Sequence, residues 1–284
     1  MTNILVALRN IVNNPVTELV SFYNGSNRAN NMWDALETYI KDIFCDSLSL
    51  SDSEKDIKYS ESFSYLWNQN NPPDIIIKNW DAIEVKKIES LNSAIALNSS
   101  YPKNKLHNDD TRITSECRNC ESIPWASKDI IYVIWVSLKN SKKLKAIWFI
   151  YWDCYCSDRS IYQRVADKIS EWILCIPDVE LVKTNELAKV KKVDPLWITD
   201  LRVRWMWHIE NPIKVFQNIA RIEKEDTFTV HAIIPEEKYY SFPEVDRRGL
   251  EDIQDSNFAI SDTKIKSPDN PAKLLNVKHI SYAK

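Results

Sequence analysis

Apolar residues follow two different periods along the chain, and these periods predict its helices and strands. Helical spacing of apolar residues predicts amphipathic helices at residues 3–12, 27–44 and 158–173. Short runs rich in β-branched and aromatic residues predict strands at residues 63–67, 75–77, 82–85, 129–136, 146–152, 179–182 and 227–234. Elements in this order indicate an α/β fold, in which a mixed β-sheet is flanked by helices.

The hydrophobic pattern and the length of the chain also indicate how many domains to expect. The chain of 284 residues is long enough to bury one full hydrophobic core. It contains no internal repeat and no low-complexity linker, so we expect a single domain over residues 1–284. The apolar pattern weakens after residue 235, and we expect residues 256–284 to form a weakly patterned tail.

Composition places the chain among ordinary globular proteins. Apolar residues make up 44% and charged residues 27%, which is not the balance of a disordered chain. No apolar run approaches the roughly 18 residues needed to span a bilayer, and the N-terminus does not look like a signal peptide. We therefore expect a cytoplasmic protein without a membrane partner.

Two carboxylates and a lysine stand close together on a predicted hairpin. Asp74 precedes the first strand of the hairpin, Glu84 lies on the second, and Lys86 follows two positions later. Carboxylate oxygens on a rigid hairpin suit Mg²⁺, which usually takes one or two protein carboxylates besides water and phosphate oxygens. A lysine beside the ion can orient the attacking water and offset negative charge in the transition state. This Pro-Asp…Glu-x-Lys arrangement is typical of metal-dependent nucleases.

The register of the hairpin decides whether these side chains meet. Because side chains alternate between faces, a two-residue loop would put Asp74 and Glu84 on opposite faces. A three-residue loop at 79–81 pairs Asp74 with Lys86 and places all three polar groups on one face. We predict this loop, with one left-handed residue in the turn. Spacing alone leaves open an ordinary amphipathic hairpin whose polar residues are exposed.

Glycine is almost absent from the chain. It occurs twice, against an average of about 7% of residues, while tryptophan occurs 11 times. Trp80 follows Asn79 in the predicted turn, where Asn-Gly is the usual pair. One hypothesis is that several tryptophans correspond to UGA codons, which some bacterial lineages read as glycine. The alternative is a genuine tryptophan-rich protein from an AT-rich genome.

Several stretches of the chain match one protein family in order. They are residues 27–30, 35–37, 63–66, 70–74, 81–90, 96–100, 202–204 and 209–212. Through them the chain resembles the NgoPII family of type II restriction endonucleases, over most of its length and fading after about residue 240. The resemblance implies a restriction-endonuclease-like core of the PD-(D/E)xK type at about residues 27–175 and a DNA-contacting elaboration at about 195–250.

The resemblance also implies where the chain departs from the family. It implies glycine at positions that hold Trp33, Trp67, Trp80, Trp135, Trp152 and Trp205. These departures are independent support for the UGA hypothesis.

Catalytic roles follow from the resemblance in the same way. Asp74 and Glu84 would bind Mg²⁺, and Lys86 would orient or help to deprotonate the attacking water. Glu37 on the helix predicted at 27–44 would reach the outer coordination shell of the ion. For Glu37 an ordinary exposed helix position remains open.

The resemblance further implies cleavage of double-stranded DNA at the palindrome GGCC. A two-fold symmetric site calls for a homodimer, and a DNA methyltransferase encoded nearby would protect the host. Guanine O6 and N7 are usual partners of arginine and lysine. The expected DNA-contacting residues are Arg202 and Arg204 first, then Ser99, Ser100, Lys103 and Lys105.

Two other functions stay open at this point. A repair, recombination or mobile-element nuclease could use the same catalytic core without recognising a palindrome. A non-catalytic DNA-binding protein is the third possibility, and it would follow if Trp80 displaced the metal ligands.

Overall fold

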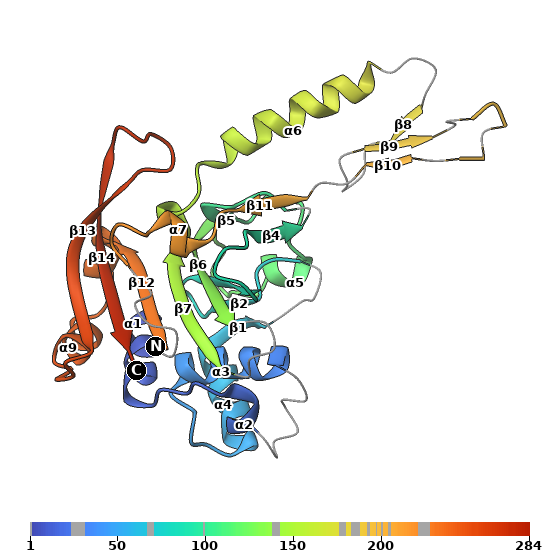
Figure 1. Ribbon diagram of the computed structural model, residues 1–284. Coiled ribbons are helices and arrows are strands. Elements are labelled where there is room, and N and C mark those ends of the chain that lie inside the picture. Colours follow the sequence, from blue (N-terminus) through green and yellow to red (C-terminus); the bar gives the residue numbers. More distant parts are fainter. Residues whose placement is uncertain are drawn as a thin grey trace.

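A computed structural model describes residues 2–23, 32–66, 71–98, 100–137, 143–175, 180–182, 188–191, 194–196, 198–199, 201–203, 206–220 and 228–284. Its central feature is a large mixed sheet with helices packed at its lower half (Figure 1). The α/β prediction is therefore confirmed.

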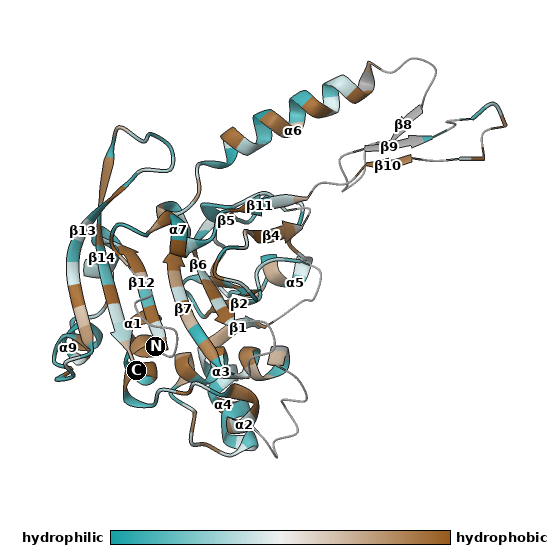
Figure 2. Ribbon diagram, viewed as in Figure 1, coloured by the Kyte–Doolittle hydropathy of each residue, from teal (hydrophilic) through white to brown (hydrophobic). Residues whose placement is uncertain are grey.

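The large sheet has nine strands. Eight of them run in the order β1 (Phe63–Leu66), β2 (Ile75–Ile77), β3 (Ala82–Ile88), β6 (Ser127–Ser137), β7 (Leu144–Tyr151), β12 (Thr229–Pro235), β14 (Leu274–Ala283) and β13 (Phe258–Lys266), and β5 (Lys105–His107) pairs with β6. The pairs β3–β6 and β7–β12 are parallel, and the other neighbours are antiparallel. Brown strands at the centre of Figure 2 show where the sheet is most apolar.

Helices surround the sheet and connect its strands. They are α1 (Ile4–Asn13), α2 (Leu19–Phe22), α3 (Met32–Cys45), α4 (Asp52–Ser62), α5 (Ser115–Arg118), α6 (Arg159–Leu174), α7 (Pro212–Val215), α8 (Glu236–Ser241) and α9 (Glu244–Glu251), with a 3₁₀ turn η1 (Trp152–Cys154). The helices predicted at 3–12, 27–44 and 158–173 correspond to α1, α3 and α6. Asn3 begins α1 by accepting hydrogen bonds from the N–H groups of Leu5 and Val6.

Helix α3 packs on one face of the sheet through aromatic contacts. Tyr39 meets the ring of Trp135 edge-on at a centroid distance of 5.7 Å, and Phe44 lies 6.5 Å from Phe149. Adjacent residues of a strand point to opposite faces. Glu84 and Lys86 therefore lie on the face opposite Val85.

A buried carboxylate joins the helices at the base of the molecule. Asp42 of α3 is fully buried and accepts hydrogen bonds from four side chains on the surrounding elements. The donors are Tyr23 (2.7 Å), Ser47 (2.7 Å), Lys55 (2.5 Å) and Tyr59 (2.5 Å). With this many charge-assisted partners, the carboxylate can remain buried while it fixes α3 against α4.

Two segments differ from the sequence-based expectation. Residues 256–284 are not a tail, because β13 and β14 form a long hairpin that completes the large sheet. The polar run Ser261–Lys264 lies on the edge strand β13, where exposed polar residues conceal the strand pattern. Helix α4 was not expected either, although Ser51 and Glu54 form a capping box at its start.

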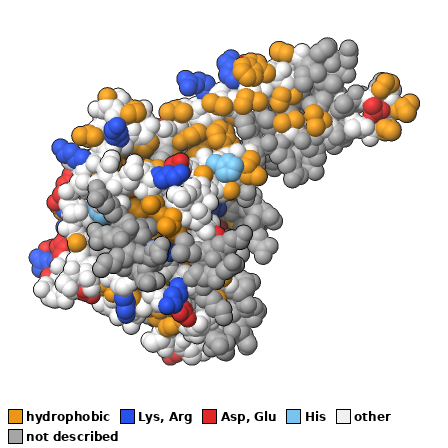
Figure 3. Space-filling view, viewed as in Figure 1, with side chains coloured by type: hydrophobic (Ala, Val, Ile, Leu, Met, Phe, Trp, Pro, Cys, Tyr) orange, Lys and Arg blue, Asp and Glu red, His pale blue; other side chains and the backbone are white. Residues whose placement is uncertain are grey.

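A second part of the chain extends away from the sheet. Helix α6 leads to a small sheet of β8 (Glu180–Val182), β9 (Ala188–Lys191) and β10 (Leu201–Val203) (Figure 1). Below it β4 (Ile95–Asn98) pairs with β11 (Trp207–Ile209). Apolar side chains run along this extension in Figure 3, and Trp172 of α6 is 71% exposed. None of the helices in the described ranges is long and apolar enough to cross a membrane.

Candidate active site

The predicted catalytic residues meet where β2 and β3 run side by side. Asp74 directly precedes β2, and its backbone N–H donates to the carbonyl of Ile83 at 3.0 Å. Ile75 pairs with Ile83 and Ile76 with Ala82, so this register places Asp74 opposite Glu84. Lys86 lies two residues further along the same face of β3. The structure therefore brings the three side chains together, as the hairpin analysis predicted.

The loop that sets this register lies one residue earlier than expected. Ile77 donates its N–H to the carbonyl of Asp81 (2.9 Å), so the loop is 78–80 and not 79–81. Asp74 consequently faces Glu84 and not Lys86. The left-handed residue is Asn79, with φ of 58°, which asparagine tolerates better than most residues. Trp80 does not have a positive φ, so turn geometry gives no reason to expect glycine there.

Each carboxylate has one oxygen fixed by the protein. Asp74 Oδ2 accepts the backbone N–H of Val85 at 2.6 Å, and Glu84 Oε1 accepts from the Lys86 ammonium at 2.6 Å. Glu84 Oε2 is buried and has no hydrogen-bond partner. Asp74 and Glu84 are only 9% and 8% exposed, so water does little to compensate for this missing partner.

The pKa values of Asp74 and Lys86 reflect two carboxylates that lie close together. Burial raises the pKa of Asp74 well above its usual range, and the Glu84 carboxylate raises it further, while Lys86 and the Val85 N–H act in the opposite direction. Burial lowers the pKa of Lys86, but Glu84 and Asp74 outweigh burial and raise it overall. The lysine is therefore a fixed positive charge beside two carboxylates.

This arrangement fits a divalent cation. A cation between Asp74 and Glu84 would relieve the repulsion between them and give Glu84 Oε2 the partner that it lacks. Two carboxylates are also the usual protein contribution to a Mg²⁺ site. Within the described ranges, no group of three or more His, Cys, Asp or Glu residues is arranged to hold a metal ion. Asp74 and Glu84 would therefore have to be supplemented by backbone, water or substrate oxygens.

Glu37 of helix α3 lies near Asp74. Its carboxylate is close enough to contribute to the raised pKa of Asp74. Burial raises the pKa of Glu37 itself, whereas Lys41 lowers it. Glu37 is half-buried, so the open alternative of a fully exposed helix glutamate does not describe its position.

A network of ion pairs holds the hairpin at Asp81, immediately before β3. Lys238 of α8 lies 2.6 Å from Asp81 and 2.8 Å from Asp129, and Tyr151 donates to the other oxygen of Asp81 at 2.6 Å. These contacts hold Asp81 immediately before β3, which explains why this residue belongs to the strand side of the hairpin and not to its loop. Sequence spacing could not reveal this, because Lys238 is remote in the chain.

Tyr132 is a pocket residue that the sequence analysis missed. It lies on β6 opposite Glu84 and is buried. Burial raises the pKa of Tyr132 well above its usual range, and the nearby carboxylates of Glu84 and Asp74 add to the effect. The apolar run of β6 gave no signal, because a tyrosine within it reads as an ordinary core residue.

The predicted DNA-contacting residues are more dispersed. Ser100 is half-buried beyond β4, whereas Ser99 and Arg204 lie outside the described residues, as does the side chain of Arg202 on β10. Lys103 is 4% exposed and pairs with Asp110 at 2.5 Å. Lys105 pairs with Asp129 at 2.5 Å and is partly exposed. The two lysines would have to give up these partners to contact phosphate.

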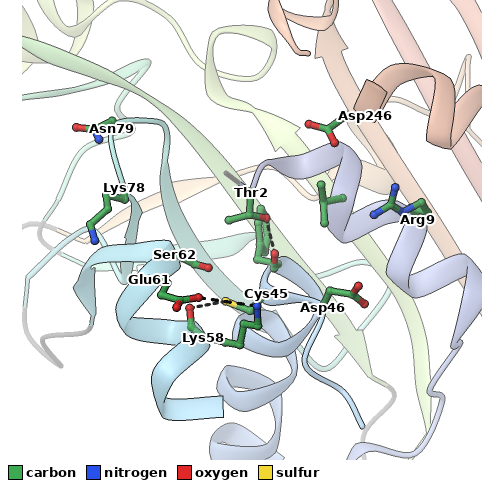
Figure 4. Close-up of a pocket in the computed structure, with 12 residues that line it drawn as sticks. Thr2, Arg9, Cys45, Asp46, Lys58, Glu61, Ser62, Lys78, Asn79 and Asp246 are labelled. Atoms are coloured by element: carbon green, nitrogen blue, oxygen red, sulfur yellow. Dashed lines mark hydrogen bonds and ion pairs between the residues drawn. The ribbon is translucent and has the colours of Figure 1, made fainter. Parts of the chain in front are cut away.

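A cavity of about 450 Å³ is lined in part by the hairpin turn (Figure 4). Lys78 and Asn79 line it together with residues of α1, α3 and α4, but Asp74, Glu84 and Lys86 do not. Its charged side chains are of both signs, such as Lys58 and Glu61. The catalytic candidates therefore form a separate site.

Two comparisons with known proteins point to the same family. The family model described as NgoPII restriction endonuclease matches residues 2–266. The chain is 47% identical over 280 residues to the curated Type II restriction enzyme NgoPII of Neisseria gonorrhoeae, and the alignment covers 99% of each chain. No solved structure matches the chain.

Proposed function

Because the chain belongs to the NgoPII family of type II restriction endonucleases, we propose that it hydrolyses double-stranded DNA at the palindrome GGCC with Mg²⁺. Membership makes the chain a site-specific deoxyribonuclease that acts on DNA and depends on a divalent metal. The observation that carries the proposal is the site in which Asp74 and Glu84 face each other beside Lys86.

Each pocket residue has a separate task in this proposal. Asp74 and Glu84 would hold Mg²⁺, together with the carbonyl of Val85 and a phosphate oxygen of the substrate. When bound, the ion supplies Lewis-acid polarisation of the phosphate and a lower pKa for water. Glu37 would accept hydrogen bonds from water in the outer shell.

Lys86 would act on the nucleophile and on the developing charge. Its ammonium is fixed by Glu84 at 2.6 Å, so it can orient a water molecule and stabilise the extra negative charge of the transition state. The water oxygen forms a bond to phosphorus while the bond to the 3′ oxygen breaks. The products are a 5′-phosphate and a 3′-hydroxyl, and one proton passes to solvent.

Recognition of a palindrome calls for two copies of the chain. A homodimer would place two pockets on the two strands of the two-fold symmetric site. Arg202 and Arg204 are proposed to read guanine, with Ser99 and Ser100 at base edges or phosphates. Lys103 and Lys105 would join them only by exchanging their ion pairs.

The substrate indicates which neighbouring gene and which cell compartment to expect. A nuclease that cuts GGCC endangers the host genome, so we expect a DNA methyltransferase that recognises the same site to be encoded nearby. Foreign DNA is met inside the cell, and the cytoplasm is therefore the expected location.

The test uses short duplexes that differ only in the recognition sequence. One duplex carries GGCC and the other carries the same bases scrambled, and each is incubated with Mg²⁺ or with EDTA. Cleavage of the GGCC duplex alone, only with Mg²⁺, is the expected result. Cleavage of both duplexes would favour a repair, recombination or mobile-element nuclease. Binding without cleavage of either would favour a DNA-binding protein.

A further inference from the structure

The rings of Tyr132 and Trp152 lie too close together for ordinary packing. Their centroids are 3.2 Å apart at an interplanar angle of 25°. Favourable aromatic pairs have centroids about 4.5–7 Å apart, and carbon atoms attract best at roughly 3.5–4.0 Å. Trp152 is fully buried at the start of η1, so the ring cannot move outward into solvent. The space at position 152 is therefore too small for a tryptophan ring.

The indole nitrogen of Trp152 adds a second anomaly. Its N–H is buried and has no hydrogen-bond partner, a feature that it shares with Trp80, Trp125, Trp135 and Trp148. Buried tryptophan normally finds an acceptor for this group. By contrast, Trp207 is half-buried among Tyr101 and Tyr162 with centroid distances of 6.4 Å and 5.8 Å. Trp152 therefore combines an unpaired N–H with a ring contact shorter than that of a favourable aromatic pair.

Position 152 borders the catalytic pocket. The Tyr132 ring against which Trp152 is pressed lies opposite Glu84 in the parallel pair β3–β6. Overpacked cores shift neighbouring side chains and backbone. A displaced Tyr132 would therefore shift β3, the strand that carries Glu84.

We infer that the catalytic site of this enzyme is built for glycine at position 152. Glycine there removes both the contact with Tyr132 and the unpaired N–H group of Trp152. The same exchange at further positions would account for a chain with 2 glycines and 11 tryptophans, if their codons are UGA and the cell reads UGA as glycine. The consequence for catalysis rests on the proposed function, but the consequence for stability does not.

The inference makes an unusual prediction for stability. Replacing a well-packed core tryptophan by glycine normally lowers the Tm by roughly 10 °C. Here Trp152→Gly should raise the Tm by at least about 3 °C, because overpacking and an unpaired donor are removed. Trp207→Gly is the matched control and should show the ordinary loss.

The outcomes of thermal unfolding and of codon reading each decide the inference. A Tm gain for Trp152→Gly together with a loss for Trp207→Gly supports it, as does UGA at codon 152. A Tm loss or failure to fold for Trp152→Gly overturns it, and so does UGG at codon 152. If Trp152→Gly and Trp207→Gly both fold but neither cuts GGCC, the change in Tm still decides the inference about position 152, and the proposed function fails.

Discussion

The Lys86 ammonium lies 2.6 Å from Glu84 Oε1, two residues apart on one face of β3. Only one oxygen of Glu84 is used in this contact, and Oε2 is buried without a partner. The pair thus joins a fixed positive charge to a carboxylate with a free coordination position. Asp74 lies opposite Glu84 across the hairpin, so the second ligand is also in place.

Lys86→Ala should abolish most cleavage and leave the fold intact. Loss of a group that stabilises charge in the transition state costs about 10²–10⁴ in rate. The measurement is kcat on a GGCC duplex under saturating Mg²⁺. Lys87→Ala is the control, because Lys87 is on the opposite face of β3 and pairs with Glu89. Equal losses in both variants would show that Lys86 has no special role.

Metal binding should stabilise the enzyme before any DNA is present. An ion that binds only the folded state adds about 2.7 kcal/mol at 100 times its Kd. Titration with Mg²⁺ should therefore raise the Tm of the wild-type chain, and EDTA should reverse the rise. Asp74→Ala should remove the effect, since one of two carboxylates is lost. A Tm rise of the same size in Asp74→Ala would place the ion elsewhere.

The buried carboxylate of Asp42 should contribute strongly to stability. Asp42→Ala would leave the Lys55 ammonium, which is 5% exposed, without its 2.5 Å partner. Breaking a buried ion pair in this way costs about 3–5 kcal/mol. Urea unfolding measures the loss. Glu61→Ala on α4, the helix that carries Lys55, is the control, because its 3.8 Å contact with Lys58 is exposed and worth little.

Stability should fall on acidification because of His231. Burial, with a smaller contribution from His279, lowers the pKa of His231 from 6.5 to about 3. The unfolded state therefore takes up a proton near pH 6.5, while the folded state resists it. Stability from this residue is complete above pH 6.5 and is lost as pH falls toward 3, by about 1.4 kcal/mol per pH unit.

Comparison of two variants isolates this pH dependence from that of the carboxylates. His231→Gln should flatten the profile of urea stability between pH 6.5 and about pH 4.5, relative to the wild-type chain. The exposed His208 serves as control, so His208→Gln should leave the profile unchanged. A wild-type slope that persists in His231→Gln would show that another group takes up the proton.

The sequence predicted most of the sheet but not its full width. Residues 130–136 of β6 and 146–151 of β7 are continuously apolar, as expected of strands buried on both faces, and could be recognised directly. The outer hairpin of β13 and β14 was missed because its exposed edge carries Ser261, Asp262 and Lys264. Local polarity there reflects solvent on the edge strand and not the absence of a strand.

The site was predictable in its residues and less so in its geometry. Alternation along β3 required Glu84 and Lys86 to share a face, and the Pro-Asp…Glu-x-Lys spacing singled out Asp74. The register of the hairpin depends on Asp81, which Lys238 and Tyr151 hold at the strand. Contacts between residues so far apart in the chain cannot be read from local spacing, and the same holds for Tyr132 beside Glu84.

The central claim is that the Asp74–Glu84–Lys86 pocket performs Mg²⁺-dependent cleavage at GGCC. Plasmid DNA with known GGCC positions is digested with the chain carrying Trp152→Gly, with the unsubstituted chain and with an Asp74→Ala variant of each. Discrete fragments that match the GGCC map and disappear in the Asp74→Ala variants are the predicted result. Absence of such fragments from both parent chains, or cutting that survives Asp74→Ala, would contradict the claim.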